Sequence, residues 1–321
     1  MRRPIKSNRF LVLGRAGMDL YADPPGTQVE EARQFVAALG GSAANIAVAI
    51  AKLGGTASLI SAVSDDAVGR FTLNELRRYG VGSAHVAKVG GEARNSLAVV
   101  ETRANNTQSV IYRNNAADFQ LAEEQMQAVA WADFDALIVT GTSLAVEPSR
   151  AAAFLAVRLA RMSGLTTILD VDYRPYSWIS REDAAFTCAR AAVLSDIVIA
   201  NDDEFAVLVG PDGDGLALAL ALTAHSEIVV YKMGERGCVT FSEGGRFETG
   251  VFPVEALKPT GAGDAFMGSF VTSLAAGFAL KDCVRRGAAA AAIVVTRVGC
   301  APASPTLAEL EEFMSAHALA H

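Results

Sequence analysis

Short apolar segments that alternate with amphipathic ones constrain the fold of this chain more than any other feature. The apolar segments are rich in β-branched residues and have no polar face, which is typical of strands buried on both sides of a parallel sheet. They lie at residues 10–13, 57–63, 136–140, 166–171, 197–200 and 228–231. Helical periodicity occupies the intervals, for example at residues 71–79, 148–163 and 202–209. This order predicts an α/β fold with a doubly wound, mostly parallel sheet and helices on both faces.

Two segments interrupt the alternation. Residues 21–39 are polar and contain prolines, and residues 96–113 contain runs in which apolar and polar positions alternate. We expect both segments to form antiparallel strands of a small β-sheet lid beside the main layer. Because no internal repeat or clear linker divides the sequence, we expect residues 1–321 to form a single domain that carries this lid.

The charge and the apolar runs of the chain exclude several classes of partner. The formal net charge is −7 at pH 7 and no basic block is present, which disfavours nucleic acid and anionic membranes as partners. The apolar run at residues 288–295 is far shorter than the roughly 20 residues of a membrane helix, and the apolar run near the N-terminus is too short for a signal peptide. We therefore expect a cytoplasmic protein with reduced, mostly buried cysteines.

A turn near the C-terminus carries the strongest chemical signal. Thr260-Gly261-Ala262-Gly263-Asp264 precedes a helical segment, and its small residues let backbone N–H groups gather at the helix start, where negative charge is favoured. Asp264 can take a proton from a hydroxyl while these amides hold a phosphoryl group. The turn therefore predicts phosphoryl transfer to an alcohol, with Asp264 as the base and residues 261–263 as the anion hole.

Two elements in the N-terminal part are candidates for binding a hydroxylated substrate. The turn Gly40-Gly41 precedes a helix for which Ser42 is a suitable N-cap. Asn45, one turn into that helix, needs a buried hydrogen-bond partner such as a sugar hydroxyl, although the glycines are also consistent with an ordinary turn. Asp19 follows the first strand and can accept two hydroxyl hydrogen bonds, whereas a solvated loop acid is the alternative.

Polar residues also follow three later strands. Arg174 is suited to a phosphate or a substrate carboxylate, with a surface ion pair as the alternative. Asn201 and Glu204 begin a helix and are suited to organising Mg²⁺ through water, although acids are common in any first helical turn. The glycines of residues 232–237 suit either a nucleotide or a hairpin. A Walker-type loop is absent from the sequence, and no dinucleotide fingerprint follows the first strand.

The glycine-rich turns at residues 40–45 and 260–264 together resemble those of the ribokinase/PfkB carbohydrate kinases, and the similarity runs from about residue 10 to about residue 305. The resemblance implies a ribokinase-like fold and the use of ATP and Mg²⁺. It also implies site residues. For the sugar they are Asp19, Gly40, Gly41 and Asn45; for ATP, Lys232, Gly234, Gly237 and Gly263; for Mg²⁺ and phosphate, Asn201 and Glu204; for the chemical step, Gly261, Ala262, Gly263 and Asp264.

The stretches at residues 13–21, 112–118, 170–175 and 254–258 resemble those of family members that act on sugar acids. Arg113 and Arg174 match positions at which such kinases meet the acid. The resemblance implies phosphorylation of the terminal hydroxyl of a sugar acid. The substrate it favours most is 5-dehydro-2-deoxy-D-gluconate, an intermediate of inositol catabolism. A kinase for 2-keto-3-deoxygluconate or another sugar is the alternative, and a sugar-binding protein without turnover is disfavoured by the intact Asp264, Asn201 and Glu204.

Lys258 departs from the family pattern. Many relatives carry an aspartate six residues before the catalytic one, where it helps to bind potassium. An ammonium group cannot ligate a cation, but it can supply the same positive charge behind the anion hole. We therefore expect that activity does not require a monovalent cation. We also expect a homodimer formed through the lid, because an exposed sheet is often covered by a second copy.

Overall fold

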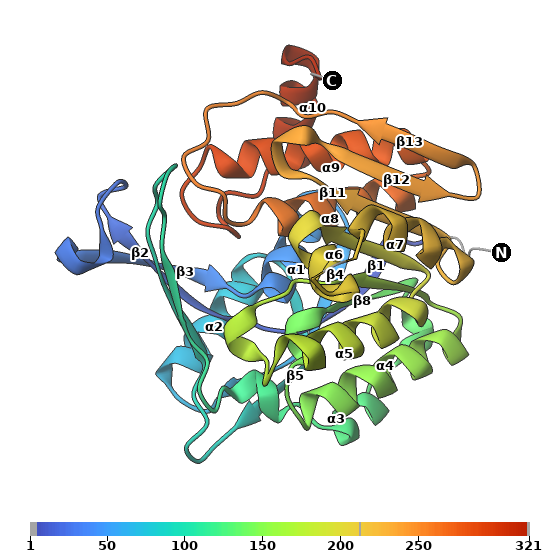
Figure 1. Ribbon diagram of the computed structural model, residues 1–321. Helices are drawn as coiled ribbons and strands as arrows, with labels where there is room; N and C mark the ends of the chain where they lie inside the picture. Colours follow the sequence, from blue (N-terminus) through green and yellow to red (C-terminus); the bar gives the residue numbers. More distant parts are fainter. Residues whose placement is uncertain (1–4, 212, 320–321) are drawn as a thin grey trace.

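The computed structural model describes residues 5–211 and 213–319, and nine of the described strands form one large sheet (Figure 1). These strands are β1 (Arg9–Leu13), β4 (Thr56–Ser64), β5 (Gly82–Val89), β8 (Ala136–Thr140), β9 (Thr166–Asp170), β10 (Ile197–Asn201), β11 (Ile228–Lys232), β12 (Cys238–Ser242) and β13 (Gly245–Thr249). Their order is β13-β12-β11-β10-β9-β8-β1-β4-β5. Neighbours from β11 to β5 pair in parallel, whereas β12 and β13 are added antiparallel at one edge.

Alternate side chains of the central strands enter two separate hydrophobic cores. In β1, Leu11 and Leu13 belong to one core, and Phe10 and Val12 belong to the other. The first core is covered by α3 (Glu123–Gln127), α4 (Ser149–Ser163), α5 (Arg181–Val193), α6 (Asp202–Val209) and α7 (Gly215–Ala221). The second is covered by α1 (Ser42–Lys52), α2 (Ala67–Arg78), α8 (Ala262–Ala275) and α9 (Leu280–Val295), and α10 (Leu307–Ala316) packs on α9. The α/β fold with helices on both faces is confirmed.

The predicted strands are all present, with bounds that shift by at most one residue. The helix predicted at residues 202–209 is α6, and that predicted at 148–163 is α4, which begins one residue later. The helix predicted at 71–79 is α2, which begins four residues earlier, at Ala67. The reason is Asp66, whose side chain accepts hydrogen bonds from the amides of Val68 and Gly69 and so caps an earlier start.

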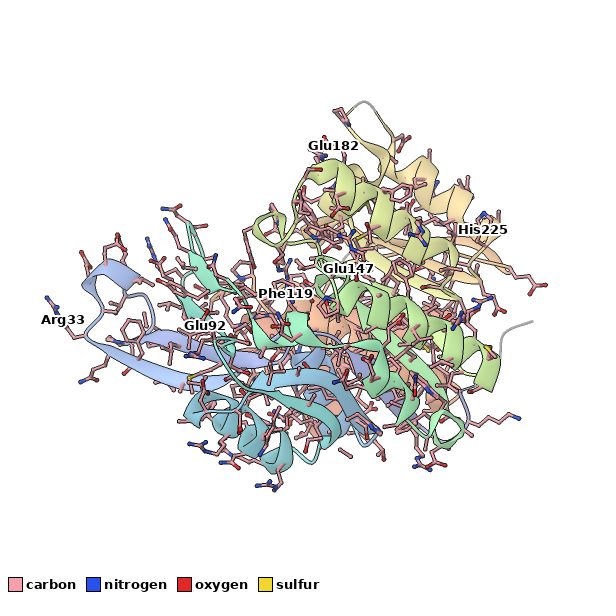
Figure 2. All side chains as sticks on the ribbon, turned by 90° about the horizontal axis from the view of Figure 1, so that it is seen from below. Arg33, Glu92, Phe119, Glu147, Glu182 and His225 are labelled. Atoms are coloured by element: carbon pink, nitrogen blue, oxygen red, sulfur yellow. The ribbon has the colours of Figure 1, made fainter. Side chains whose placement is uncertain are left out.

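The smaller sheet contains β2 (Gly17–Asp23), β3 (Gln34–Gly40), β6 (Ser96–Val100) and β7 (Ser109–Tyr112), in the order β3-β2-β6-β7. It projects from the main body at the left of Figure 1, and Arg33 lies at its outer end in Figure 2. The predicted lid sheet is thus present, but β2 begins before residue 21. Asp19 therefore lies inside a lid strand and not in a loop after the first strand.

The pairing within the lid also corrects an expectation. β2 pairs with β3 and β6 with β7 in antiparallel fashion, but β2 and β6 are parallel. A parallel pair needs a long crossover, and the chain between β2 and β6 provides one because it passes through β3, α1, β4, α2 and β5.

The remaining elements are short 3₁₀ turns, at Val29–Glu31, Ala117–Gln120, Trp131–Asp133, Gly141–Leu144, Pro175–Ser177, Leu222–Ala224 and Gly234–Arg236. All four cysteines are buried, as expected. Within residues 5–211 and 213–319, none of the helices combines the length and the apolar character that crossing a membrane requires.

Candidate active site

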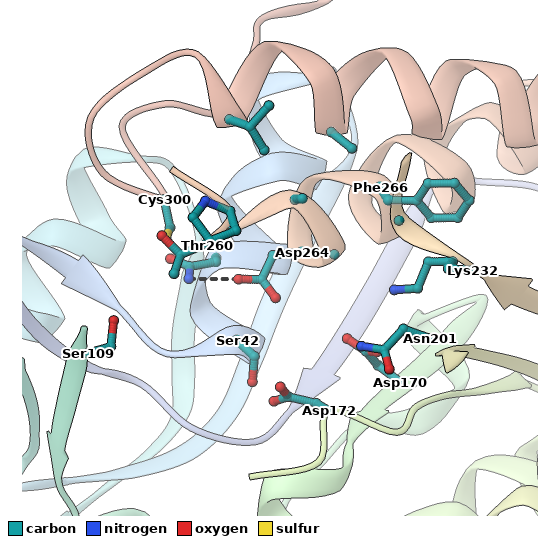
Figure 3. Close-up of a pocket in the computed structure, with 18 of the residues that line it drawn as sticks. Ser42, Ser109, Asp170, Asp172, Asn201, Lys232, Thr260, Asp264, Phe266 and Cys300 are labelled. Carbon is teal, nitrogen blue, oxygen red and sulfur yellow. Dashed lines mark hydrogen bonds between the residues drawn. The ribbon is translucent and has the colours of Figure 1, made fainter. Parts of the chain in front are cut away.

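A cavity of about 1040 Å³ extends from the lid strands to α9. Most of the predicted site residues line it: Asp19, Asn45, Arg113, Arg174, Asn201, Glu204, Lys232, Gly234, Gly237, Gly261, Ala262, Gly263 and Asp264. Figure 3 shows Lys232, Asn201 and Asp170 grouped on one side of Asp264, and Thr260 and Cys300 on the other. Residues that are far apart in the sequence therefore meet in one cavity.

The centre of this site is the first turn of α8. Gly261 is the N-cap, and its φ of 86° lies in the left-handed region that glycine adopts without strain. In the part of the chain that the structure describes, the amides of residues 261–264 donate to no protein acceptor, as the first turn of a helix requires. These amides and the helix dipole form an anion site.

Asp264 stands in the same turn and contacts α1. Its Oδ2 accepts a hydrogen bond of 2.9 Å from Nδ2 of Asn45, drawn as a dashed line in Figure 3. Burial and then the negative charge of Asp172 raise the pKa of Asp264 to about 7, although the Asn45 hydrogen bond and the charge of Arg174 oppose this shift. A carboxylate with a pKa near neutrality is well matched to accepting a proton from a substrate hydroxyl.

We expect the kcat/KM of the enzyme to rise with pH through an acidic limb near pH 7 and then to level off. The reason is that Asp264, if it is the base that the sequence predicts, can accept a proton only in its ionised form, which is depleted below its pKa of about 7. Asp172→Asn should move this limb to lower pH, because it removes a negative charge that disfavours ionisation of Asp264. The measurement is kcat/KM against pH for both proteins, and an identical limb in the two would contradict the assignment.

Asn45 was expected to bind a sugar hydroxyl. Its amide nitrogen holds Asp264, while its Oδ1 is buried and has no partner among the described residues. That oxygen is the part of Asn45 that a hydroxyl donor can still satisfy. The expectation that Ser42 caps this helix is wrong: Gly41 is the N-cap of α1, and Ser42 is the first helical residue. The hydroxyl of Ser42 instead lies 3.5 Å from that of Thr142.

Asp19 lies at the lid end of the cavity. Tyr21 donates its hydroxyl proton to Oδ2 of Asp19 at 3.1 Å, and Oδ1 of Asp19 has no partner among the described residues. Gly40 and Gly41 do not line the cavity; they allow close packing behind it. A Cβ at Gly40 would overlap the carboxylate of Asp19, and one at Gly41 would overlap the carbonyl of Arg15. The two glycines therefore position Asp19 against the start of α1.

The two predicted acid-binding arginines reach the cavity but have internal acid partners. Arg113 is buried, forms an ion pair with Asp118 and lies 3.9 Å from the ring centroid of Phe119, which Figure 2 labels. Nη2 of Arg174 is 2.7 Å from Oδ1 of Asp172. A substrate carboxylate at either arginine would therefore compete with an acid of the protein.

Asn201 and Glu204 are held by the N-terminus of α6. Oδ1 of Asn201 accepts from the amide of Glu204, and Oε2 of Glu204 accepts from the amide of Asn201, both at 2.8 Å. Oε1 of Glu204 accepts from the amide of Tyr173 at 3.1 Å. The two side chains thus form a reciprocal cap, which fixes their positions but occupies part of their hydrogen-bonding capacity.

The donor set around Glu204 suits a hydrated divalent cation. Burial raises the pKa of Asp170 and that of Glu204, and Lys232 opposes both shifts. In the described part of the chain, no three His, Cys, Asp or Glu side chains converge as a direct metal cage. Mg²⁺ keeps several of its waters and uses few protein ligands, so carboxylates spaced along a cavity wall fit it.

Lys232 lies beside the first turn of α8. Its Nζ is 3.4 Å from the point that a Cβ on Gly263 would occupy and 5.7 Å from the ring centroid of Phe266. A cation beside a helix N-terminus is suited to phosphate. Gly234 and Gly237, in the turn that joins β11 to β12, complete this wall, and Ala288, Ala291, Ala292 and Val295 of α9 give its far end an apolar surface.

Lys258 lies behind the anion site and not in the cavity wall. It is fully buried, and its ammonium group donates to the carbonyl oxygen of Thr260, the residue before Gly261. Burial lowers the pKa of Lys258, whereas Cys300, Asp264 and Asp19 raise it.

The cavity also contains polar residues that were not singled out from the sequence, among them Arg15, Asp170, Asp172 and Tyr176. The position of Asp170 at the end of β9 is a usable signal, because the carboxyl ends of parallel strands face the ligand crevice. Arg15 follows β1 and carries the same signal. Asp172 and Tyr176 lie in the irregular segment after β9, for which local sequence predicts no orientation.

The matching family model identifies the class of this protein. Residues 7–307 match the model of the pfkB family carbohydrate kinases, and the chain belongs to this family. It is similar to the 5-dehydro-2-deoxygluconokinase of Photobacterium profundum, with 41% identity over 310 residues that cover 95% of this chain and 94% of that protein.

Solved structures show the same fold. A fructokinase from Xylella fastidiosa with bound ATP is 25% identical, with a TM-score of 0.86, and covers 97% of this chain and 99% of its own. A ribokinase II from E. coli in complex with ATP and Mg²⁺ is 21% identical, with a TM-score of 0.86. The match covers 96% of this chain and 99% of that chain. The protein is thus a carbohydrate kinase of the pfkB family.

Proposed function

We propose that the protein transfers the γ-phosphoryl group of ATP to the terminal hydroxyl of 5-dehydro-2-deoxy-D-gluconate and yields the 6-phosphate. The observation that carries this proposal is the position of Asp264, a carboxylate with a pKa of about 7 in the same turn as the unpaired amides of α8. The 41% identical relative, whose name specifies this sugar acid, supports the choice of substrate.

In the proposed mechanism, Asp264 orients the hydroxyl and accepts its proton as the oxygen forms a bond to the γ-phosphorus. The bond between that phosphorus and the leaving oxygen of ADP breaks on the opposite side. The amides of residues 261–263 and the ammonium group of Lys232 stabilise the phosphoryl charge. Asn201 and Glu204 would hold Mg²⁺ through its water ligands, and the bound ion would neutralise phosphate charge.

The lid contributes the sugar side of the site. Ala98 and Val100 of β6 and Ser109 and Ile111 of β7 line the cavity from the lid. We propose that they cover the bound sugar and exclude water, which would otherwise accept the phosphoryl group. The unsatisfied Oδ1 atoms of Asp19 and Asn45 would accept hydrogen bonds from sugar hydroxyls.

A substrate panel tests the proposal. ADP release is measured with 5-dehydro-2-deoxygluconate, 2-keto-3-deoxygluconate and fructose, each with Mg²⁺ and ATP. We expect the highest kcat/KM for the first sugar. A higher value for 2-keto-3-deoxygluconate would select the alternative kinase, and absence of turnover with all three would refute the proposed substrate class.

We propose that the charge of Lys258 replaces a monovalent cation behind the anion hole. Its complete burial and its contact with the carbonyl of Thr260 support this role. The rate of ADP release should therefore be the same in sodium, potassium and tetramethylammonium salts at equal ionic strength. Lys258→Met should lower kcat in all three salts, because the anion hole loses a fixed positive charge. A several-fold potassium requirement of the unaltered enzyme would contradict the proposal.

We also propose a homodimer formed through the lid. Three large apolar side chains on the lid face turned away from the cavity are more than two-fifths exposed: Phe35 of β3, and Val110 and Tyr112 of β7. A lid face of this kind favours pairing with a second copy. Sedimentation velocity should give a dimer that Val110→Glu weakens, and a monomeric wild type at assay concentrations would be inconsistent with it. The single-domain assignment of residues 1–321 and the cytoplasmic location stay predictions.

A further inference from the structure

Arg15 places a nearly buried positive charge in the wall of the cavity. It follows β1, is 9% exposed and lines the cavity. Its Nη1 donates to the hydroxyl of Ser96 at 3.2 Å, and among the described residues no carboxylate lies within ion-pair distance of it. A guanidinium has five N–H donors and stays charged, so its near-burial is costly unless an anion joins it.

Asp19 is the acid near Arg15, but it does not neutralise the charge of the guanidinium. Arg15 lowers the pKa of Asp19, so the two charges are close, but burial outweighs this effect and raises the pKa of Asp19 overall. One oxygen of Asp19 already accepts the hydroxyl of Tyr21. Asp19 is thus a weak counter-ion, whose remaining oxygen suits a sugar hydroxyl.

The other two arginines of this region differ from Arg15 in their pairing. Arg113 has Asp118, and Arg174 has Asp172. All three arginines line the same cavity, together with Tyr176. Burial raises the pKa of Tyr176, and the positive charge of each arginine opposes this shift. Only Arg15, of these three, relies on a neutral partner.

The backbone of Arg15 is fixed relative to the catalytic centre. Its carbonyl oxygen accepts from the amide of Ala44 at 3.3 Å, in the helix turn that also contains Asn45. Since Asn45 holds Asp264, a ligand bound by Arg15 is held in a defined position relative to the base.

We propose that Arg15, and not Arg113 or Arg174, binds the carboxylate of the sugar acid and so makes this kinase selective for acids over neutral sugars. The free N–H groups of its guanidinium match a carboxylate in a two-bond arrangement. This inference rests on the proposed function, since it assigns the acid-binding subsite of the proposed substrate.

The test compares 5-dehydro-2-deoxygluconate with its C1 carboxamide, which has the same shape but no charge. Arg15→Gln should lower kcat/KM for the acid by about 10- to 100-fold, mainly through KM, because a charge-assisted contact is lost. The value for the carboxamide should change much less. Arg15→Lys keeps the charge but not the forked arrangement of donors. Its kcat/KM for the acid should therefore lie between the values for the wild type and for Arg15→Gln. Arg174→Gln is the matched control and should keep the preference for the acid.

The outcomes separate this inference from the proposed function. If the wild type phosphorylates the acid but Arg15→Gln and Arg15→Lys, folded by circular dichroism, keep the same preference for it, the inference is refuted and the function stands. The inference is also refuted if the preference disappears in Arg174→Gln alone. If the wild type turns over neither the acid nor its carboxamide, the proposed function itself is refuted, and the inference falls with it.

Discussion

Replacing Asp264 by asparagine is expected to lower kcat by a factor of about 10² to 10⁴, the range typical of a lost general base. Asparagine has nearly the same shape as aspartate but cannot accept the substrate proton. The amides of the α8 turn and the side chain of Lys232 are untouched by the change, so we expect binding of ATP to be retained. The measurements are kcat from ADP release and nucleotide affinity from calorimetry.

Asp203→Asn is the matched control for this prediction. Asp203 also lies in the first turn of a helix, α6, but it does not line the cavity. This variant should keep the wild-type kcat, because it removes a first-turn charge without removing a base. Near-normal turnover by Asp264→Asn, or an equal loss in the two variants, would show that Asp264 is not the catalytic base.

Replacing Gly261 by alanine is expected to lower kcat by a factor of about 10² to 10³, comparable with the loss of one donor from an anion hole. Gly261 has a φ of 86°, and a Cβ there would lie 2.9 Å from Sγ of Cys300 and 3.1 Å from Cγ1 of Val294. The backbone must shift to relieve this crowding, and the amides of the turn shift with it. Steady-state kinetics and the Tm of the variant are the measurements.

Gly277→Ala separates backbone strain from damage to the site. Gly277 follows α8, has a φ of 81°, and has no atom within 4 Å of the position of a Cβ. Alanine there should cost about 1 to 2 kcal/mol of stability, because the left-handed conformation is unfavourable for it. Its kcat should be unchanged. If the two variants lose stability and activity in parallel, the effect at Gly261 is structural and not catalytic.

The sequence predicted the central strands well because burial on both faces requires runs of apolar residues, whatever the partners are. The sequence did not predict β5, because this strand is not buried on both faces. None of its residues is fully buried, so its apolar run is weak. The sequence placed the start of the lid too late and treated Asp19 as a residue outside the lid strands. Pairing of β2 with β3 and β6 decides that position, and pairing is not encoded within the segment itself.

The features of the site are likewise of two kinds, local ones that the sequence can predict and long-range ones that it cannot. The small residues around Asp264 act within one helical turn, so neighbouring residues in the sequence are enough to predict them. The reciprocal cap of Asn201 and Glu204 is equally local, but these two residues were expected only to organise Mg²⁺ through water. The hydrogen bond from Asn45 to Asp264 joins residues 219 positions apart. Whether an arginine is paired, like Arg174, or open, like Arg15, depends on which acid the packing brings near it.

The amino-acid sequence alone therefore determined the fold class, the order of the strands along the chain and the glycine-rich turn at the start of α8, because each depends on local periodicity and local backbone conformation. Only the tertiary structure decided which polar groups satisfy one another and which keep an atom for a ligand. The physical reason is that a buried charge or hydrogen-bonding group is stable only with a partner, and the folded chain selects that partner by distance in space and not by distance in sequence.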